Sequence, residues 1–323
     1  MQTWQRNLYT IWIAELLAIA GFTVVTPFLP YYVQELGVTE LEQVEFWSGL
    51  LFASQAVAMA IFSPIWGSVA DRYGRKLMIE RAMFSGAVVL GAMGFVRNVQ
   101  QLLVLRALQG CLTGTVAAAM TLVASSVPRQ RTGQALGLLQ MAVYSGSSAG
   151  PLIGGLVADH FGYRAAFLVT GVLLFLAGIT VAIFVHEEFE PPRHEAGSRK
   201  SDFWLGVRTV LHSRELLGVL GIELAMQLGA KIMGPVLPLF VQALVPGEAR
   251  VASLTGLITG LGAATSAVGA VLLGQASDRF GHRTVLLSCT LGLAVAYVPQ
   301  FFVTTPTQLL VLQATAGAAM GGG

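Results

Sequence analysis

Long apolar stretches alternate with short polar segments along the whole chain. Each stretch approaches or exceeds the roughly 20 residues that an α-helix needs to cross a bilayer. The pattern therefore predicts an all-α polytopic membrane protein with ten spans in this sequence. The spans are expected at residues 8–33, 46–70, 77–96, 99–127, 135–158, 165–185, 216–241, 251–276, 285–303 and 307–323.

Composition supports a membrane protein and not a soluble domain. Hydrophobic residues make up 54% of the chain and charged residues 11%, against about 25% charged residues in soluble domains. The first stretch contains Glu15 and is too long and polar for a cleaved signal peptide, so we expect the N-terminus to be retained. Cys111 and Cys289 fall in different predicted spans, which favours packing roles over a disulfide.

The basic residues predict the orientation. With the N-terminus placed in the cytoplasm, the inner segments hold fourteen lysines and arginines and the outer segments hold three. This is a strong positive-inside bias, so the net charge of +2 reflects topology and not a nucleic-acid surface. The inner residues are Arg6, Arg72, Arg75, Lys76, Arg81, Arg129, Arg131, Arg193, Arg199, Lys200, Arg208, Arg214, Arg279 and Arg283; the outer ones are Arg97, Arg164 and Arg250.

The chain contains an internal repeat. The glycine-framed segment 67–76 recurs at 274–283, and the segment 101–110 recurs at 308–317, both at an offset of 207 residues. In addition, Glu15, Pro27 and Pro30 match Glu223, Pro235 and Pro238 at an offset of 208. These repeats predict two six-helix pseudo-repeats, of which the second has four helices in this sequence and lacks its last two.

A polar segment separates the two predicted halves, residues 1–186 and 216–323. Residues 187–215 are charged and contain Pro191-Pro192, so they are expected to form a cytoplasmic linker. After a predicted N-cap at Ser201-Asp202, apolar residues recur at helical spacing, which predicts an amphipathic helix on the membrane surface. A disordered linker is the alternative. The apolar residues are Phe203, Trp204, Val207, Val210 and Leu211.

The repeated hairpin carries a family resemblance. Residues 67–76 resemble the loop 2–3 signature of the major facilitator superfamily, glycine-x-leucine-alanine-aspartate-arginine-x-glycine-arginine-lysine, with Val69 in place of leucine; the second copy is looser at His282. The resemblance implies a twelve-helix transporter fold in which the hairpins latch the inner side, the first one against helix 11. The alternative is that Arg72, Arg75 and Lys76 serve only to fix the orientation of the chain in the membrane. The implied latch residues are Gly67, Asp71, Arg72, Gly74, Arg75 and Lys76, with Gly274, Asp278, Arg279 and Gly281.

A second motif lies in the fifth span, where Gly146, Gly150, Pro151, Gly154 and Gly155 resemble the antiporter signature of the same family. Glycines four residues apart form a smooth stripe against which another helix can pack closely. We expect this stripe to face the one formed by Gly256, Gly260 and Ala264 in the eighth span, across the boundary between the halves. Pro151 would stiffen the contact, and the motif favours exchange over facilitated diffusion.

Three ionisable residues within the predicted spans are candidates for proton coupling. Leu105-Arg106-Ala-Leu-Gln-Gly110 resembles the fourth-helix motif of drug:proton antiporters, in which the arginine is tied to proton coupling. Glu15 and Glu223 are candidates for binding the proton, because a low dielectric favours a protonated carboxylate. The alternatives are a structural arginine paired with a carboxylate and, for each glutamate, a fixed ion pair.

Other polar residues in the spans are candidates for binding substrate. Lys231 follows Glu223 and Gln227 at helical steps of four, and it would favour a carboxylate or phosphate on the substrate. Snorkelling of Lys231 to the interface is the alternative. Gln55, Gln140 and Tyr144 are further candidate contacts, for which packing is the alternative.

The sequence contains no phosphate-binding loop, no His/Cys cluster with metal spacing and no nucleophile elbow, so we expect no enzyme, cofactor or metal. The predicted function is proton-coupled export of small amphipathic compounds by a monomer in a bacterial inner membrane. An uptake symporter on the same fold, and a non-transporting sensor or truncated partner, are the alternatives.

Overall fold

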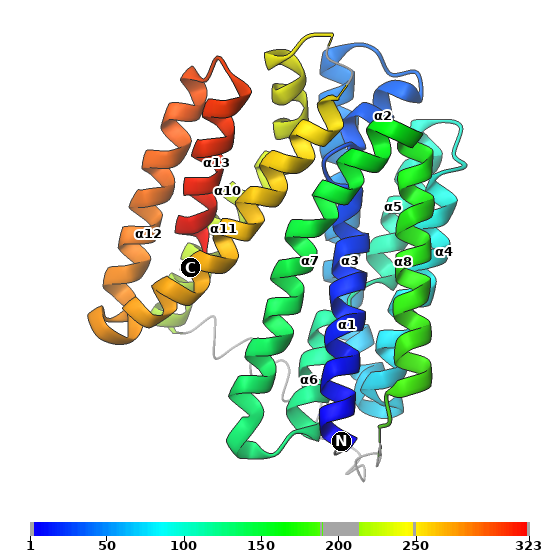
Figure 1. The fold of residues 1–323 in the computed structure, drawn as a ribbon, viewed down its shortest axis with the longest axis vertical. Helices are drawn as coiled ribbons and strands as arrows, with labels where there is room; N and C mark the ends of the chain where they lie inside the picture. The colour runs from blue at the N-terminus through cyan, green and yellow to red at the C-terminus, as the bar shows by residue number, and fades with distance from the viewer. Residues whose placement is uncertain (1–2, 188, 190–212, 248–249, 322–323) are drawn as a thin grey trace.

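The computed structural model describes residues 3–187, 189, 213–247 and 250–321, and every regular element among them is helical (Figure 1). The first half comprises α1 (Thr3–Val24), α2 (Leu29–Glu35), α3 (Leu41–Tyr73), α4 (Arg75–Met93), α5 (Val99–Leu112), α6 (Val116–Ser126), η1 (Arg129–Arg131), α7 (Thr132–Phe161) and α8 (Tyr163–Phe184). The second comprises α10 (Arg214–Leu244), α11 (Val251–Phe280), α12 (His282–Tyr297), η2 (Val298–Phe302) and α13 (Pro306–Met320).

The helices have the length and surface of membrane spans. Within the described residues, six helical segments are long and apolar enough to cross a bilayer. Large apolar side chains are exposed on these segments, for example Val172 at 58% and Val268 at 59%. Such faces suit lipid and not water, so the structure confirms the prediction of an all-α polytopic membrane protein.

Two predicted spans are not continuous helices. The first is interrupted at residues 25–28 between α1 and α2, where Pro27 and Pro30 deprive the backbone of two donors. The fourth is interrupted at residues 113–115 between α5 and α6, where Gly114 has a φ of +125°. The prolines equivalent to the first pair, Pro235 and Pro238, lie inside the unbroken α10.

The internal repeat reappears in local geometry. Gly74 and Gly281, 207 residues apart, both have positive φ (97° and 84°) and stand immediately before α4 and α12. The side chains of Asn98 and Thr305 accept hydrogen bonds from the backbone N–H of the glutamine three residues later, and each glutamine side chain accepts from the residue before its cap. These are two helix caps of the same kind at equivalent positions, and they resemble capping boxes with the return bond moved one residue earlier.

The two halves meet at one end of the molecule. The end that carries the Gly74 and Gly281 turns is here called the hairpin end, and the opposite end, which carries α2, the loop end. In Figure 1, α7 and α11 approach each other toward the loop end and diverge toward the hairpin end. The glycines near the hairpin end of these helices, Gly133, Gly137 and Gly274, have no atoms beyond their own helix within reach of an added Cβ.

The glycines of α7 face two different helices, which corrects the expected packing. An added Cβ on Gly146, Gly150 or Gly154 would collide with α1, at Leu16, Ala20 and Val24. On the α11 side, Gly155 lies against Ala252, Gly256 against the carbonyl of Pro151, and Gly260 against Ser148. The stripe of α11 therefore faces α7 as predicted, whereas most of the α7 stripe packs inside its own half.

The hydrophobic core is distributed unevenly. One large cluster fills the first half and includes Ile11, Leu51, Met83 and Phe167. A smaller cluster in the second half joins α10, α11, α13 and Val303, which follows η2. The amphipathic helix predicted at 201–211 lies outside the described residues, and the division at residues 187–215 stays a prediction.

The packing of α7 on α1 predicts a sharp difference between two glycines of the same helix. Gly154→Ala would force a methyl group into the Val24 backbone, so we expect a loss of stability of about 1–3 kcal/mol. Gly137→Ala, on the exposed part of α7, should be neutral or stabilising by up to about 1 kcal/mol. Thermal unfolding of the detergent-solubilised variants measures both; equal effects would contradict the close packing.

Candidate functional site

Glu15 is buried within the first half. Its side chain is 0% exposed, and Oε2 accepts a hydrogen bond of 2.9 Å from the hydroxyl of Thr115. Oε1 has no partner among the described residues. The interruption between α5 and α6 brings Thr115 to α1, because the chain leaves the helix at Gly114 and restarts after Thr115.

Arg106 is buried on α5 and lies among amides and an aromatic ring. It is 3% exposed, and its Nη1 donates to Oε1 of Gln55 at 2.9 Å and to Oε1 of Gln109 at 3.0 Å. Its guanidinium carbon lies 5.8 Å from the ring centroid of Phe52. Nε has no hydrogen-bond partner in the described part of the chain.

These contacts bear on the alternative in which Arg106 only pairs with a neighbouring carboxylate. No ion pair between Arg106 and a carboxylate occurs among the described residues, and its cation is stabilised by two amide oxygens and by a cation–π contact instead. Gln55 was predicted as a substrate contact, and the structure places it on Arg106. The sequence analysis did not single out Gln109 or Thr115; Gln109 carries the one available signal, since it lies one helical turn after Arg106.

The remaining candidate contacts lie on α7 and α10. Gln140 and Tyr144 are half-buried and one helical turn apart on α7. Glu223, Gln227 and Lys231 lie on α10, and their side chains are outside the described part of the structure. The structure therefore leaves the predicted Glu223–Gln227–Lys231 face untested.

The first hairpin is fastened by contacts with its own Asp71 and with Glu187, the first residue of the predicted linker. Arg75 pairs with Asp71 at 3.1 Å, and the backbone N–H groups of Arg75 and Lys76 donate to the two oxygens of Glu187 at 3.0 and 2.7 Å. Gly74 is required here twice, because its φ is positive and an added Cβ would lie 2.8 Å from Glu187 Oε2. Glu187 thus caps α4, a contact that the sequence analysis missed.

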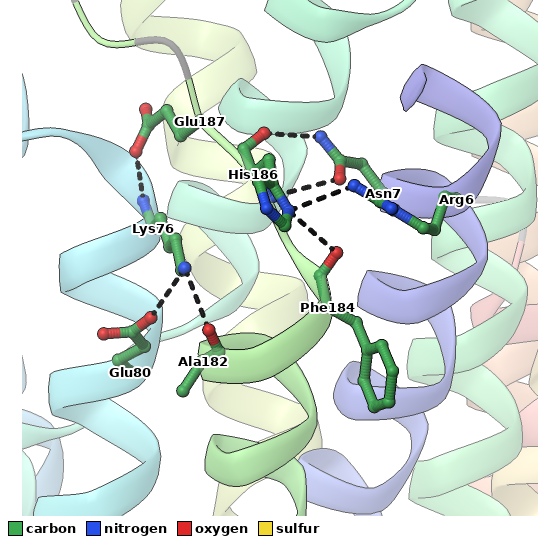
Figure 2. Close-up of polar contacts among 8 residues, drawn as sticks. All are labelled: Arg6, Asn7, Lys76, Glu80, Ala182, Phe184, His186 and Glu187. Atoms are coloured by element: carbon green, nitrogen blue, oxygen red, sulfur yellow. Dashed lines mark hydrogen bonds and ion pairs between the residues drawn. The ribbon is translucent and has the colours of Figure 1, made fainter. Parts of the chain in front are cut away.

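Figure 2 shows how the segment after α8 joins α1 to α4. The side chain of Asn7 donates to the carbonyl of His186 at 2.6 Å and accepts from its N–H at 3.1 Å. On the other side, Lys76 donates to the carbonyl of Ala182 at 3.1 Å and lies 3.5 Å from Glu80. The hairpin end of the first half is therefore held together by backbone-directed polar contacts.

Several other residues of the two hairpins are exposed. Gly67 and Arg72 are exposed, and the guanidinium of Arg72 lies over the ring of Tyr73. In the second copy Gly274 and Arg279 are exposed, and the side chain of Asp278 is outside the described part of the structure. The described residues do not test the contact with helix 11 that the family resemblance implies.

Comparison with known proteins decides the family. The sequence profile of the Major Facilitator Superfamily matches residues 11–247. The chain belongs to this superfamily of membrane transporters. Membership accounts for the two related halves and for both glycine hairpins, and it makes the chain a multi-pass transporter and not an enzyme.

Its curated relatives include multidrug resistance proteins. The chain is 38% identical over 322 residues to the multidrug resistance protein MdtG of Salmonella typhimurium and to that of Salmonella arizonae. Each alignment covers 98% of this chain and 78% of the relative.

Solved structures share the fold at low sequence identity. A D-xylose-proton symporter matches with a TM-score of 0.73 at 15% identity, over 99% of this chain and 80% of that one. The nucleoside transporter NupG matches with a TM-score of 0.75 at 13% identity, over 98% of this chain and 79% of that one. A bacterial homologue of the human lysosomal transporter Spinster, described as inward-facing and unoccupied, matches with a TM-score of 0.72 at 18% identity. The match covers 100% of this chain and 74% of that one. At these identities the likeness concerns the fold alone.

The Glu187 contact predicts a measurable contribution to stability. Glu187→Ala removes two charge-assisted hydrogen bonds from the start of α4 and should cost about 1–2 kcal/mol, or roughly 2–4 °C in melting temperature. Glu80→Ala is the matched control, because its contact with Lys76 is a side-chain pair along one helix worth about 0.5 kcal/mol or less. Melting temperatures are measured in a fluorescence-based assay. Equal shifts for Glu187→Ala and Glu80→Ala would show that the Glu187 cap adds no stability beyond that of the side-chain pair.

Proposed function

We propose that this transporter exports small amphipathic compounds across a bacterial inner membrane in exchange for protons, as a monomer that alternates between two conformations. The observation that carries the proposal is the 38% identity to multidrug resistance proteins over 98% of the chain. The N-terminus is placed in the cytoplasm, in line with the positive-inside bias. On this orientation the hairpin end is cytoplasmic.

Glu15 is the first candidate for the proton. It is a buried carboxylate whose Oε1 lacks a partner in the described residues, and a site of this kind gains from binding a proton. Thr115 orients the other oxygen. Glu223 is the equivalent candidate in the second half, on the strength of the repeat.

Arg106 is proposed to respond to that protonation. Its charge is held by two glutamine oxygens, which can exchange partners more readily than a carboxylate that binds as an ion pair. Movement of Gln55 on α3 would therefore be transmitted to α5 through Arg106. Gln140, Tyr144, Gln227 and Lys231 are the proposed substrate contacts, and Lys231 favours cargo with an acidic group.

The proposal includes alternation between two opposite conformations, and the shape of the molecule supports one of them. The described helices meet at the loop end and diverge at the hairpin end, which corresponds to an inward-facing state on the proposed orientation (Figure 1). Transport would require the reverse arrangement as well. The hairpin residues from Gly67 to Lys76 would then bias the balance between the two states.

The test is transport by purified protein in liposomes that contain a pH-sensitive dye, under an imposed proton gradient. Cationic, zwitterionic and anionic drugs are added in turn, and at least one should drive proton movement. Glu15→Gln or Glu223→Gln should reduce that movement by about 100-fold or more, because a neutral amide cannot bind and release a proton as a carboxylate does.

Glu45→Gln is the matched control, since Glu45 is an exposed carboxylate on α3 and should leave transport unchanged. Drug-dependent proton movement that survives both Glu15→Gln and Glu223→Gln would contradict the assignment of the proton site. No proton movement with any drug, from folded protein, would contradict the exchange itself.

A further inference from the structure

Among the described residues, three polar contacts join the halves at the loop end, in addition to the hydrogen bond of 2.8 Å from Ser148 on α7 to the carbonyl of Gly260 on α11. None of them was anticipated from the sequence. In the first, Tyr31 on α2 donates its hydroxyl proton to the carbonyl of Pro238 on α10 at 2.5 Å. The same hydroxyl lies 2.8 Å from Oγ1 of Thr255 on α11. One side chain of the first half thus touches two helices of the second.

The second contact is a pair of repeat-related glutamines. Gln34 and Gln242 lie 208 residues apart and exchange two hydrogen bonds, at 2.9 and 3.1 Å, between their side-chain amides. Two equivalent residues that bind each other lie close to the pseudo-twofold axis relating the halves. Both groups are neutral, so each can exchange its partner for water at little cost.

The third contact is the one that carries a charge. Asp159, in the last turn of α7, accepts from the backbone N–H of Ala252 at 3.2 Å and of Ser253 at 2.6 Å, both in the first turn of α11. The carboxylate therefore caps a helix that belongs to the other half, where the N–H groups have no partner in their own helix and the helix dipole favours negative charge.

Packing restricts how this contact can break. One turn before Asp159, Gly155 lies directly against the backbone of Ala252 and Ser253, so α7 and α11 touch without intervening side chains. If the loop end opens, Asp159 loses both donors at once and the first turn of α11 loses its cap. The Asp159 contact therefore opposes opening more strongly than the neutral contacts of Tyr31 and Gln34 do.

We propose that Asp159 is the positioning residue that holds the loop end of this transporter closed, through its charge-assisted contact with the start of α11. The inference rests on the proposed alternation between two conformations, in which the loop end must open once in each cycle. Asp159 would then set the ratio of the closed and open states of the loop end. This role is separate from that of the proposed proton site at Glu15.

The chain offers a matched control at the same end. Glu35 on α2 lies 3.7 Å from Arg164 on α8, and both are exposed residues of the first half. Glu35→Gln removes an outer carboxylate just as Asp159→Asn does, but it breaks no contact between the halves.

The experiment measures the distance across the loop end with the full-length protein in lipid nanodiscs. Cys111 and Cys289 are replaced by serine, and spin labels are attached at Gln100→Cys and Thr307→Cys, two exposed positions in the first turns of α5 and α13. Double electron–electron resonance then gives the population of each distance without any substrate.

We expect the labelled parent to show mainly one short distance. Asp159→Asn, and Asp159→Ser as a second neutral variant, should raise the ratio of long to short distances by on the order of ten-fold. Asp159→Glu, which keeps the charge, should restore the short distance, and Glu35→Gln should match the parent.

Identical distributions in the parent and in both neutral variants, from folded protein, would overturn the proposal. An equal shift with Glu35→Gln would also overturn it, because outer charge in general would then be responsible. Failure of drug transport leaves these distances unaffected, so the proposed function and the role of Asp159 fail separately.

Discussion

The arrangement of the molecule depends on the close approach of α7 to helices on both of its sides. Between membrane helices, apolar burial gives little driving force, so backbone contact and packing must hold them together. Gly146, Gly150 and Gly154 seat α7 against α1, and Gly155 seats it against α11. The same helix therefore belongs rigidly to one half and forms the surface on which the other half rests. The boundary between the halves lies along one side of α7.

Buried polar groups define where this rigid packing is relaxed. Glu15 and Arg106 lie in the first half with incomplete hydrogen bonding, and the helix that carries Arg106 is interrupted at Gly114, one turn beyond Gln109. Such groups reduce stability in a low dielectric, and they are found where protons or ligands bind. At the loop end the side chains of Tyr31, Gln34, Gln242 and Asp159 are instead paired across the boundary. The contrast separates groups that can bind a proton or cargo from groups that hold the two halves together.

The sequence predicted the fold well, because membrane spans, glycine hairpins and a repeated pattern are all visible without coordinates. It also placed Glu15 and Arg106 inside the membrane. It failed where a contact joins distant segments: Thr115 reaches Glu15 only because the chain is interrupted at Gly114, and Asp159 meets α11 only through tertiary packing. Gln34 and Gln242 could have been found by extending the 208-residue offset, but the fact that they bind each other could not. Most of the glycine stripe of α7 packs on α1 and not on α11 as predicted, because spacing along a helix does not say which neighbour fills each side.

The central claim is that the two halves move about the α7–α11 contact. Single-molecule fluorescence energy transfer across the hairpin end, between dyes at Gln130→Cys and Phe280→Cys in liposomes, tests it most directly. Both positions are exposed, Gln130 in η1 just before α7 and Phe280 at the end of α11. The account predicts two distances, with the shorter one becoming more populated when a transported drug and a proton gradient are present together. A single distance that stays the same under every condition would contradict it.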